Sequence, residues 1–182
     1  MVKTVAVLVG SLRKGSLNRK LAGVLEHLAG DRLAFRHCDL SDLPHYNEDL
    51  WDNPPSAVLR LKDEIENSDG VLVVSPEYNR SFPGVLKDAF DWASRPYGEN
   101  SWSGKPAACT GTSPGVIGTA VAQAHLRGQM VNLDMLVMHQ PEAYVQWKDD
   151  MLGADGKLRS DSTRSFLDGF VTRFTDHIDR VG

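Results

Sequence analysis

The sequence is poor in cysteine and contains no long hydrophobic segment. Only Cys38 and Cys109 occur among its 182 residues, and C-x-x-C is absent, so neither a disulfide framework nor a thiol-exchange site is expected. The longest apolar run near the start, Val5 to Val9, is too short for a signal-peptide core or a membrane span. We therefore expect a protein of a reducing, cytoplasmic compartment that is neither secreted nor inserted into a membrane.

Recognisable metal-ligand sets and the commonest nucleotide-binding loops are missing as well. The six histidines show neither H-x-x-x-H nor a carboxylate at ligand spacing, so no metal site is expected. Neither G-x-x-x-x-G-K-[ST] nor G-x-G-x-x-G occurs, which disfavours a nucleoside triphosphate or a Rossmann-bound pyrophosphate.

Acidic residues are absent from the first 25 positions. That segment contains five basic residues, which are Lys3, Arg13, Lys14, Arg19 and Lys20. Its charge is therefore +5, and because the whole chain carries −4, the remaining residues carry −9. Nucleic-acid binding usually needs a broad basic face, so we expect a small bound anion at this end and no nucleic-acid partner.

What the sequence does contain is a regular alternation of apolar strands and amphipathic helices. Its periodicity predicts strands at 2–9, 33–37, 70–75, 106–110 and 135–138. Helices are predicted at 17–28, 56–68, 83–93, 118–130 and 166–178, and residues 144–157 are predicted to be irregular, with a turn at Asp155-Gly156. This pattern predicts an α/β fold, a doubly wound five-stranded parallel sheet with helices on both faces, in a single domain over residues 1–182.

Three predicted loops follow the carboxyl ends of strands, where such sheets bind ligands: 10–17, 76–82 and 111–117. The first combines hydroxyls, an arginine and glycines ahead of a helix that Ser16 is placed to cap. The helix N-terminus favours an anion, and no acid in the first turn competes for it. The sequence therefore predicts a phosphate at this loop, although capping with solvated cations is the simpler alternative.

The third loop, Gly111 to Gly115, matches the G-x-S-x-G pattern of serine hydrolases, with Asp134 and His139 downstream in the required order. In that mechanism the residue after the serine donates its backbone N–H to the oxyanion. Here that residue is Pro114, which has no N–H, and losing one such donor costs about 3 to 4 kcal/mol of transition-state stabilisation. A hydrolase that uses Ser113 is therefore kept only as the last of three candidate functions, after the two that are described below.

Two segments together resemble a known family. GSLRKGSLNR at 10–19 and PEYNRSFPGVLKDA at 76–89, followed by TSPG at 112–115, resemble the signatures of the NADPH-dependent FMN reductase family. Within that family the chain is most similar to bacterial chromate and quinone reductases and related azoreductases. The resemblance covers about residues 3–140 and implies a flavodoxin-like fold with strand order 2-1-3-4-5.

The resemblance also implies which residues contact FMN. For the phosphate these are Ser11, Arg13, Ser16, Leu17 and Asn18. For the isoalloxazine ring they are Pro76, Glu77, Tyr78 and Asn79, with Ser113 and Gly115 contacting the flavin from the third loop. Arg80 departs from the aromatic residue or histidine that relatives often carry, and is the candidate to face the substrate.

The function implied by the resemblance is an FMN-dependent oxidoreductase. NADPH or NADH would donate the hydride, and quinones, azo compounds, free flavin or metal oxyanions such as chromate would accept electrons in a ping-pong mechanism. No catalytic side chain is expected, because the flavin carries the chemistry. Relatives form dimers or tetramers, so the resemblance also implies a homodimer or homotetramer. The second alternative is a flavodoxin-type electron carrier without NAD(P)H oxidase activity, against which a net charge of only −4 argues weakly.

Overall fold

A parallel sheet forms the centre of the structure, a computed structural model that describes residues 1–182. The strands β3 (Gly70–Val74) and β4 (Pro106–Ser113) are almost entirely buried, and β1 (Lys3–Val9) is buried over its centre, as expected for a sheet covered on both faces. β2 (Leu33–Cys38) lies at one edge, and the order is β2-β1-β3-β4-β5 with every pairing parallel. The predicted flavodoxin-like order is confirmed.

The far edge of the sheet differs from the prediction. β5 (Leu136–Val137) pairs only with Pro106–Ala107, and a sixth strand, β6 (Ala143–Gln146), pairs with Thr110–Ser113 farther along β4. β4 thus runs three residues beyond its predicted end, and the prediction that 144–157 is irregular was wrong for its first residues. The predicted turn at Asp155-Gly156 is present, with Gly156 at a φ of 75°.

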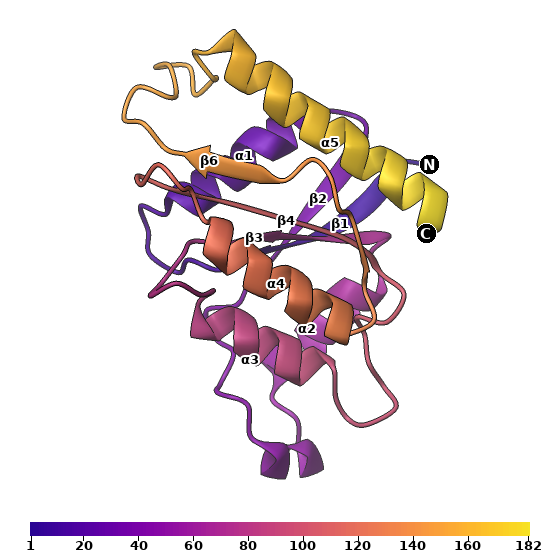
Figure 1. The fold of residues 1–182 in the computed structure, drawn as a ribbon. Coiled ribbons are helices and arrows are strands. Elements are labelled where there is room, and N and C mark those ends of the chain that lie inside the picture. The colour runs from indigo at the N-terminus through magenta and orange to yellow at the C-terminus, as the bar shows by residue number, and fades with distance from the viewer.

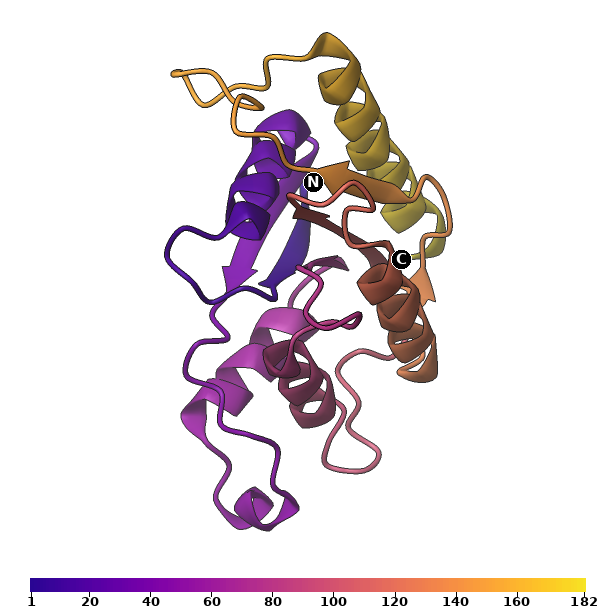
Figure 2. The same ribbon diagram turned by 60° about the vertical axis from the view of Figure 1, so that its left-hand side comes forward.

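Helices cover both faces of the sheet (Figures 1 and 2). One face packs against α1 (Leu17–Ala29) and α5 (Asp161–Val181), through a core that includes Leu21, Leu25 and Phe170. The other packs against α2 (Ser56–Glu66), α3 (Gly84–Ala93) and α4 (Ala120–Asn132). Residues 39–55, with the short helix η1 (Glu48–Asp52), project from this second layer.

Membrane-spanning helices and converging metal ligands are not found in the structure. None of the helices, α5 included, combines the length and hydropathy needed to cross a bilayer. No three histidine, cysteine or acidic side chains gather where they could hold a metal ion.

Candidate functional site

The three predicted loops leave the sheet at neighbouring strands. The Gly10 N–H donates to the Val74 carbonyl at 3.0 Å, and the Ser75 N–H donates to the Thr110 carbonyl at 2.9 Å. These bonds extend the sheet by one residue on each strand before the loops diverge. The Gly10 bond lies where the strand order reverses between β1 and β3, which is the usual ligand-binding crevice of such folds, and the Ser75 bond joins β3 to β4 beside it.

The first loop presents backbone N–H groups that have no partner in the chain. The amides of residues 11–15 make no hydrogen bond, and those of Leu17 and Asn18 begin α1 and so have no intrahelical acceptor. Ser16 caps α1 as predicted: its Oγ accepts from the Arg19 N–H at 3.1 Å, which leaves its own hydrogen free to donate. Ser11 is 4% exposed as a residue, and its hydroxyl also makes no hydrogen bond within the chain. This is a concentrated set of unused donors.

Four cations lie on or next to this loop without an acidic partner. Arg13, Lys14, Arg19 and Lys20 form no ion pair, and the first turn of α1 contains no acid. Arg13 lies over Gly15, donating from Nη2 to its carbonyl at 3.1 Å. Lys3 does not belong to the group, because it stands at the start of β1 and pairs with Asp69 at 3.4 Å. Free donors and unpaired cations fit a phosphate group.

Asn18 has a role that the sequence did not reveal. Its buried amide donates from Nδ2 to the Thr112 carbonyl at 3.0 Å and accepts from the Thr112 N–H at 2.9 Å. The side chain thereby joins the first loop to the end of β4. Asn18 fixes the position of the loop, and its Oδ1 is already engaged with the backbone.

The second loop contains a tight two-residue turn. The Tyr78 N–H and carbonyl exchange hydrogen bonds with Ser81 at 2.9 and 3.0 Å, and Asn79 and Arg80 take φ values of 50° and 64°. This left-handed conformation suits asparagine and is strained for arginine. Tyr78 is half exposed, and the Arg80 side chain is 69% exposed at the tip of the turn.

Glu77 fastens this loop to the start of α4. Its side chain is only 8% exposed. Oε2 accepts from the Val121 and Ala122 N–H groups, both at 3.1 Å, and Oε1 accepts from Arg80 at 2.9 Å. Burial alone would raise the pKa of this carboxyl, but the hydrogen bonds from Ala122, Arg80 and Val121 outweigh it, and the pKa is lowered. Only the backbone of Glu77 is left to line a ligand ring.

The third loop is held by internal hydrogen bonds. The Ser113 Oγ donates to the Gly118 carbonyl at 2.6 Å and accepts from the Gly115 N–H at 3.2 Å. Gln146 on β6 donates to the Pro114 carbonyl at 3.0 Å. The alternation Ala143-Tyr144-Val145-Gln146, buried at the first and third positions, is the period-two signal that could have identified β6 in advance.

The geometry gives Ser113 no catalytic partners. Asp134 stands before the start of β5, where its carbonyl accepts from Gly104 at 2.8 Å and its carboxylate from Ser103 at 2.6 Å. Gly104 and Ser103 precede β4, and Ser113 ends that eight-residue strand. Asp134 and Ser113 therefore lie at opposite ends of β4. A serine hydrolase needs them joined through one histidine. The structure therefore argues against the hydrolase alternative.

Exposed apolar side chains from all three loops surround the same edge. These side chains are Leu12, Tyr78, Val116 and Ile117. Of the four, the sequence indicated only Tyr78 for an apolar contact with a ligand. Apolar residues in polar loops are the signal that could have found them, because solvent-exposed loops rarely need them. A flat apolar ring beside an anionic group suits this combination of rim and loop.

Comparisons with known proteins point to the same chemistry. The family model described as NADPH-dependent FMN reductase matches residues 3–149. A quinone reductase of Pseudomonas putida is 50% identical over 97% of this chain and 95% of its own, and a 2-hydroxy-1,4-benzoquinone reductase of a Burkholderia species is 46% identical over 96% and 95%. The structure of FerB, a flavoenzyme NAD(P)H:(acceptor) oxidoreductase of Paracoccus denitrificans, superposes with a TM-score of 0.97 at 57% identity, covering both chains fully.

Proposed function

Because this chain belongs to the NADPH-dependent FMN reductase family, we propose that it reduces quinones with electrons from NAD(P)H through a bound FMN. FMN, when bound, accepts a hydride and passes electrons to an acceptor. The observation that carries the proposal is the first loop, where free backbone amides and the Ser11 and Ser16 hydroxyls lie at the carboxyl edge of the sheet beside the unpaired Arg13. The residues of the chain bind and orient, and none needs to act as an acid or a nucleophile.

The first loop is proposed to bind the FMN phosphate. Ser11, Arg13 and Ser16 would donate from their side chains, and Leu17 and Asn18 from their backbone N–H groups. The positive end of α1 adds to the attraction. Asn18 contributes indirectly too, because its bonds to Thr112 hold the loop against β4.

The second and third loops are proposed to hold the isoalloxazine ring. Pro76, Glu77, Tyr78 and Asn79 would line one side with backbone groups and the tyrosine ring, while Ser113 and Gly115 approach from the third loop. The support is their position: Glu77 ties the second loop to α4, and Gln146 ties the third loop to β6, so both loops are fixed before a ligand arrives. Preorganisation of this kind lowers the entropic cost of binding.

The nicotinamide and the acceptor are proposed to occupy the same open face in turn, which gives ping-pong kinetics. Quinones are the acceptor class that the names of the relatives favour. Azo compounds, free flavin and chromate are further proposed acceptors. Arg80 is the candidate selector, because its guanidinium, although paired with Glu77 through Nη1, stays 69% exposed at the tip of the turn and would donate to anionic acceptors or the phosphates of the dinucleotide.

A homodimer or homotetramer is proposed as the assembly. The exposed apolar residues Leu12, Val116 and Ile117 support it, since a neighbouring subunit could cover part of this rim. Multi-angle light scattering of the purified protein tests it directly, and a monomeric mass at working concentration would contradict it.

Anaerobic stopped-flow absorbance tests the proposed function. FMN-loaded protein mixed with NADPH or NADH alone should lose the absorbance of oxidised flavin at once, and a second mixing with a benzoquinone should restore it. A flavodoxin-type carrier would bind FMN but leave it oxidised after mixing with NADPH. Initial rates over both substrates should give parallel double-reciprocal lines, whereas intersecting lines would contradict the alternating mechanism.

A further inference from the structure

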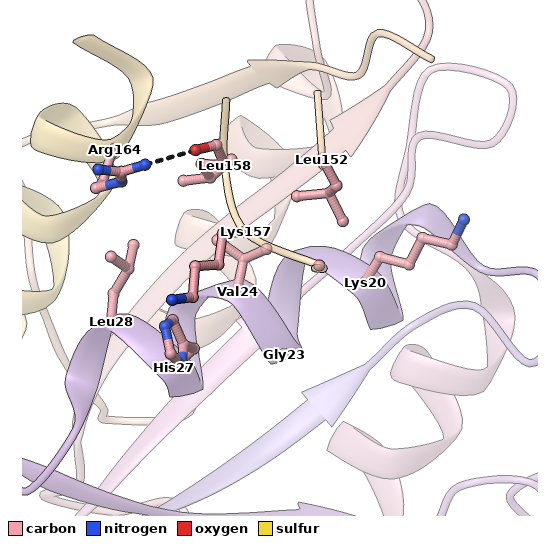
Figure 3. A pocket seen from close by; sticks show the side chains of 10 residues that line it. Lys20, Gly23, Val24, His27, Leu28, Leu152, Lys157, Leu158 and Arg164 are labelled. Carbon is pink, nitrogen blue, oxygen red and sulfur yellow. Dashed lines mark hydrogen bonds between the residues drawn. The ribbon is translucent and has the colours of Figure 1, made fainter. Parts of the chain in front are cut away.

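A pocket lies between α1 and the segment 151–159, outside the three loops (Figure 3). Its floor is one stripe of α1, from Lys20 through Gly23 and Val24 to His27 and Leu28. Its cover is the segment 151–159, which forms a small hairpin: Leu152 bridges Leu158, and the Gly153 N–H donates to the Lys157 carbonyl at 2.8 Å. This segment has no part in the proposed flavin site.

The pocket is small and apolar inside. Its volume is about 210 Å³, below the range of about 300 to 1,000 Å³ typical of drug-sized ligands. Val24, Leu28, Leu152 and Leu158 supply the apolar walls, and Leu158 is itself buried. Gly23 leaves open space where a side chain would otherwise reach, since a Cβ added there would meet no atom within 4 Å. A short hydrocarbon or one aromatic ring would fit.

The rim of this pocket is basic and lacks acids. Lys20, Lys157 and Arg164 line it together with His27, and none of the ten lining residues is acidic. Lys157 reaches from the cover toward His27 on α1 (Figure 3). Arg164 is partly engaged, because it donates to the Leu158 carbonyl at 2.7 Å and pairs with the exposed Asp161 at 3.1 Å.

From this juxtaposition we infer that the pocket binds a small amphipathic carboxylate, with the hydrocarbon against Val24, Leu28, Leu152 and Leu158 and the carboxylate beside Lys157 and His27. An apolar interior alone would accept any hydrophobic molecule. The acid-free basic rim selects an anion over a neutral or cationic analogue of the same shape. The inference does not depend on the proposed flavin chemistry.

The test is titration of the FMN-supplemented, ¹⁵N-labelled protein with octanoate, octan-1-ol and octylamine, followed by amide chemical shifts. Octanoate should give saturable shifts confined to residues 20–28 and 151–164, with octanol and octylamine weaker. Lys157→Glu should weaken octanoate roughly fivefold or more, because it replaces an attraction with a repulsion. Lys148→Glu, an exposed change shortly before the cover segment and outside the pocket, should leave the affinity unchanged.

A cavity-filling pair of variants provides the second test. Gly23→Leu should abolish octanoate binding by occupying the open space, whereas Gly128→Leu, at an equally open position in α4, should not. Flavin absorbance of each variant shows separately whether the FMN site is intact. Equal affinity for octanol and octanoate, unchanged binding in Lys157→Glu, or shifts only with phosphatidylglycerol vesicles and not with free octanoate would each overturn the inference.

Discussion

Replacing Glu77 should loosen the contact between the second loop and α4, and the cost can be worked out from its three hydrogen bonds. Glu77→Ala leaves the Val121 and Ala122 N–H groups without their acceptor. Ala122 is fully buried, so water cannot easily replace the carboxylate there. A lost hydrogen bond to a charged group costs about 1.5 to 3 kcal/mol, and two that share one oxygen are less than additive. We expect the free energy of unfolding to fall by about 2 to 4 kcal/mol.

The ion pair with Arg80 should account for little of that loss. Because the Arg80 side chain is 69% exposed, the pair resembles a surface salt bridge, for which about 0 to 1 kcal/mol is usual. Arg80→Ala is therefore the matched control, and it should leave stability nearly unchanged. Denaturant unfolding of the wild type and both variants measures the difference, and a Glu77→Ala protein as stable as Arg80→Ala would refute the reasoning.

The same carboxylate predicts a pH dependence with a defined sign. Its pKa is lowered in the folded protein from its usual 4.5, so the ionised form is the one that folding favours. Its contribution is complete above pH 4.5 and is lost as the pH falls through the lowered pKa. The gap in stability between the wild type and Glu77→Gln should therefore narrow on acidification below pH 4.5. A gap that stayed constant or widened there would contradict this assignment.

Three further predictions concern the loop, the sheet and the thiols. Arg13→Ala or Ser16→Ala should each weaken FMN binding about tenfold or more, since each removes a hydrogen bond to a charged group, while the protein stays folded by circular dichroism; unchanged quenching of flavin fluorescence in both would contradict the phosphate assignment. Gly111→Ala should destabilise the protein by about 3 kcal/mol or more, because its Cβ would overlap the Ser75 carbonyl and the Thr119 hydroxyl; a wild-type melting temperature would refute this. Burial raises the pKa of Cys38, which is also next to Glu64, to about 12 and that of Cys109 to about 11, so a disulfide reagent at pH 8 should label neither until the protein is denatured.

The fold was largely predictable because its signals are local. Five apolar segments alternating with amphipathic ones are enough to specify a doubly wound sheet, and Ser16 caps α1 at the position predicted. The sequence did not predict that two short strands, β5 and β6, pair with successive parts of β4 where a single fifth strand was expected. β5 has two residues and β6 four, and each is stabilised by its pairing with β4 more than by its own sequence.

The candidate site was predictable as a set of loops but not as a set of contacts. The acid-free segment of the first 25 residues indicated the first loop as an anion site. Lys3 is one of the five basic residues of that segment, but in the structure it lies away from the loop and pairs with Asp69. Asn18 bonding to Thr112 and Glu77 bonding to α4 join residues 94 and more than 40 positions apart. Long-range partners of this kind depend on how the chain packs, which no local pattern records.

The most direct test of the phosphate loop compares FMN with riboflavin, which differs only in lacking the phosphate. Binding of each to the purified apoprotein is measured by quenching of flavin fluorescence. If residues 11–18 bind the phosphate, FMN should bind at least about a hundredfold more tightly, since two charged hydrogen bonds of about 1.5 kcal/mol each already give that ratio. Equal affinities, or no uptake of FMN at all, would contradict the account.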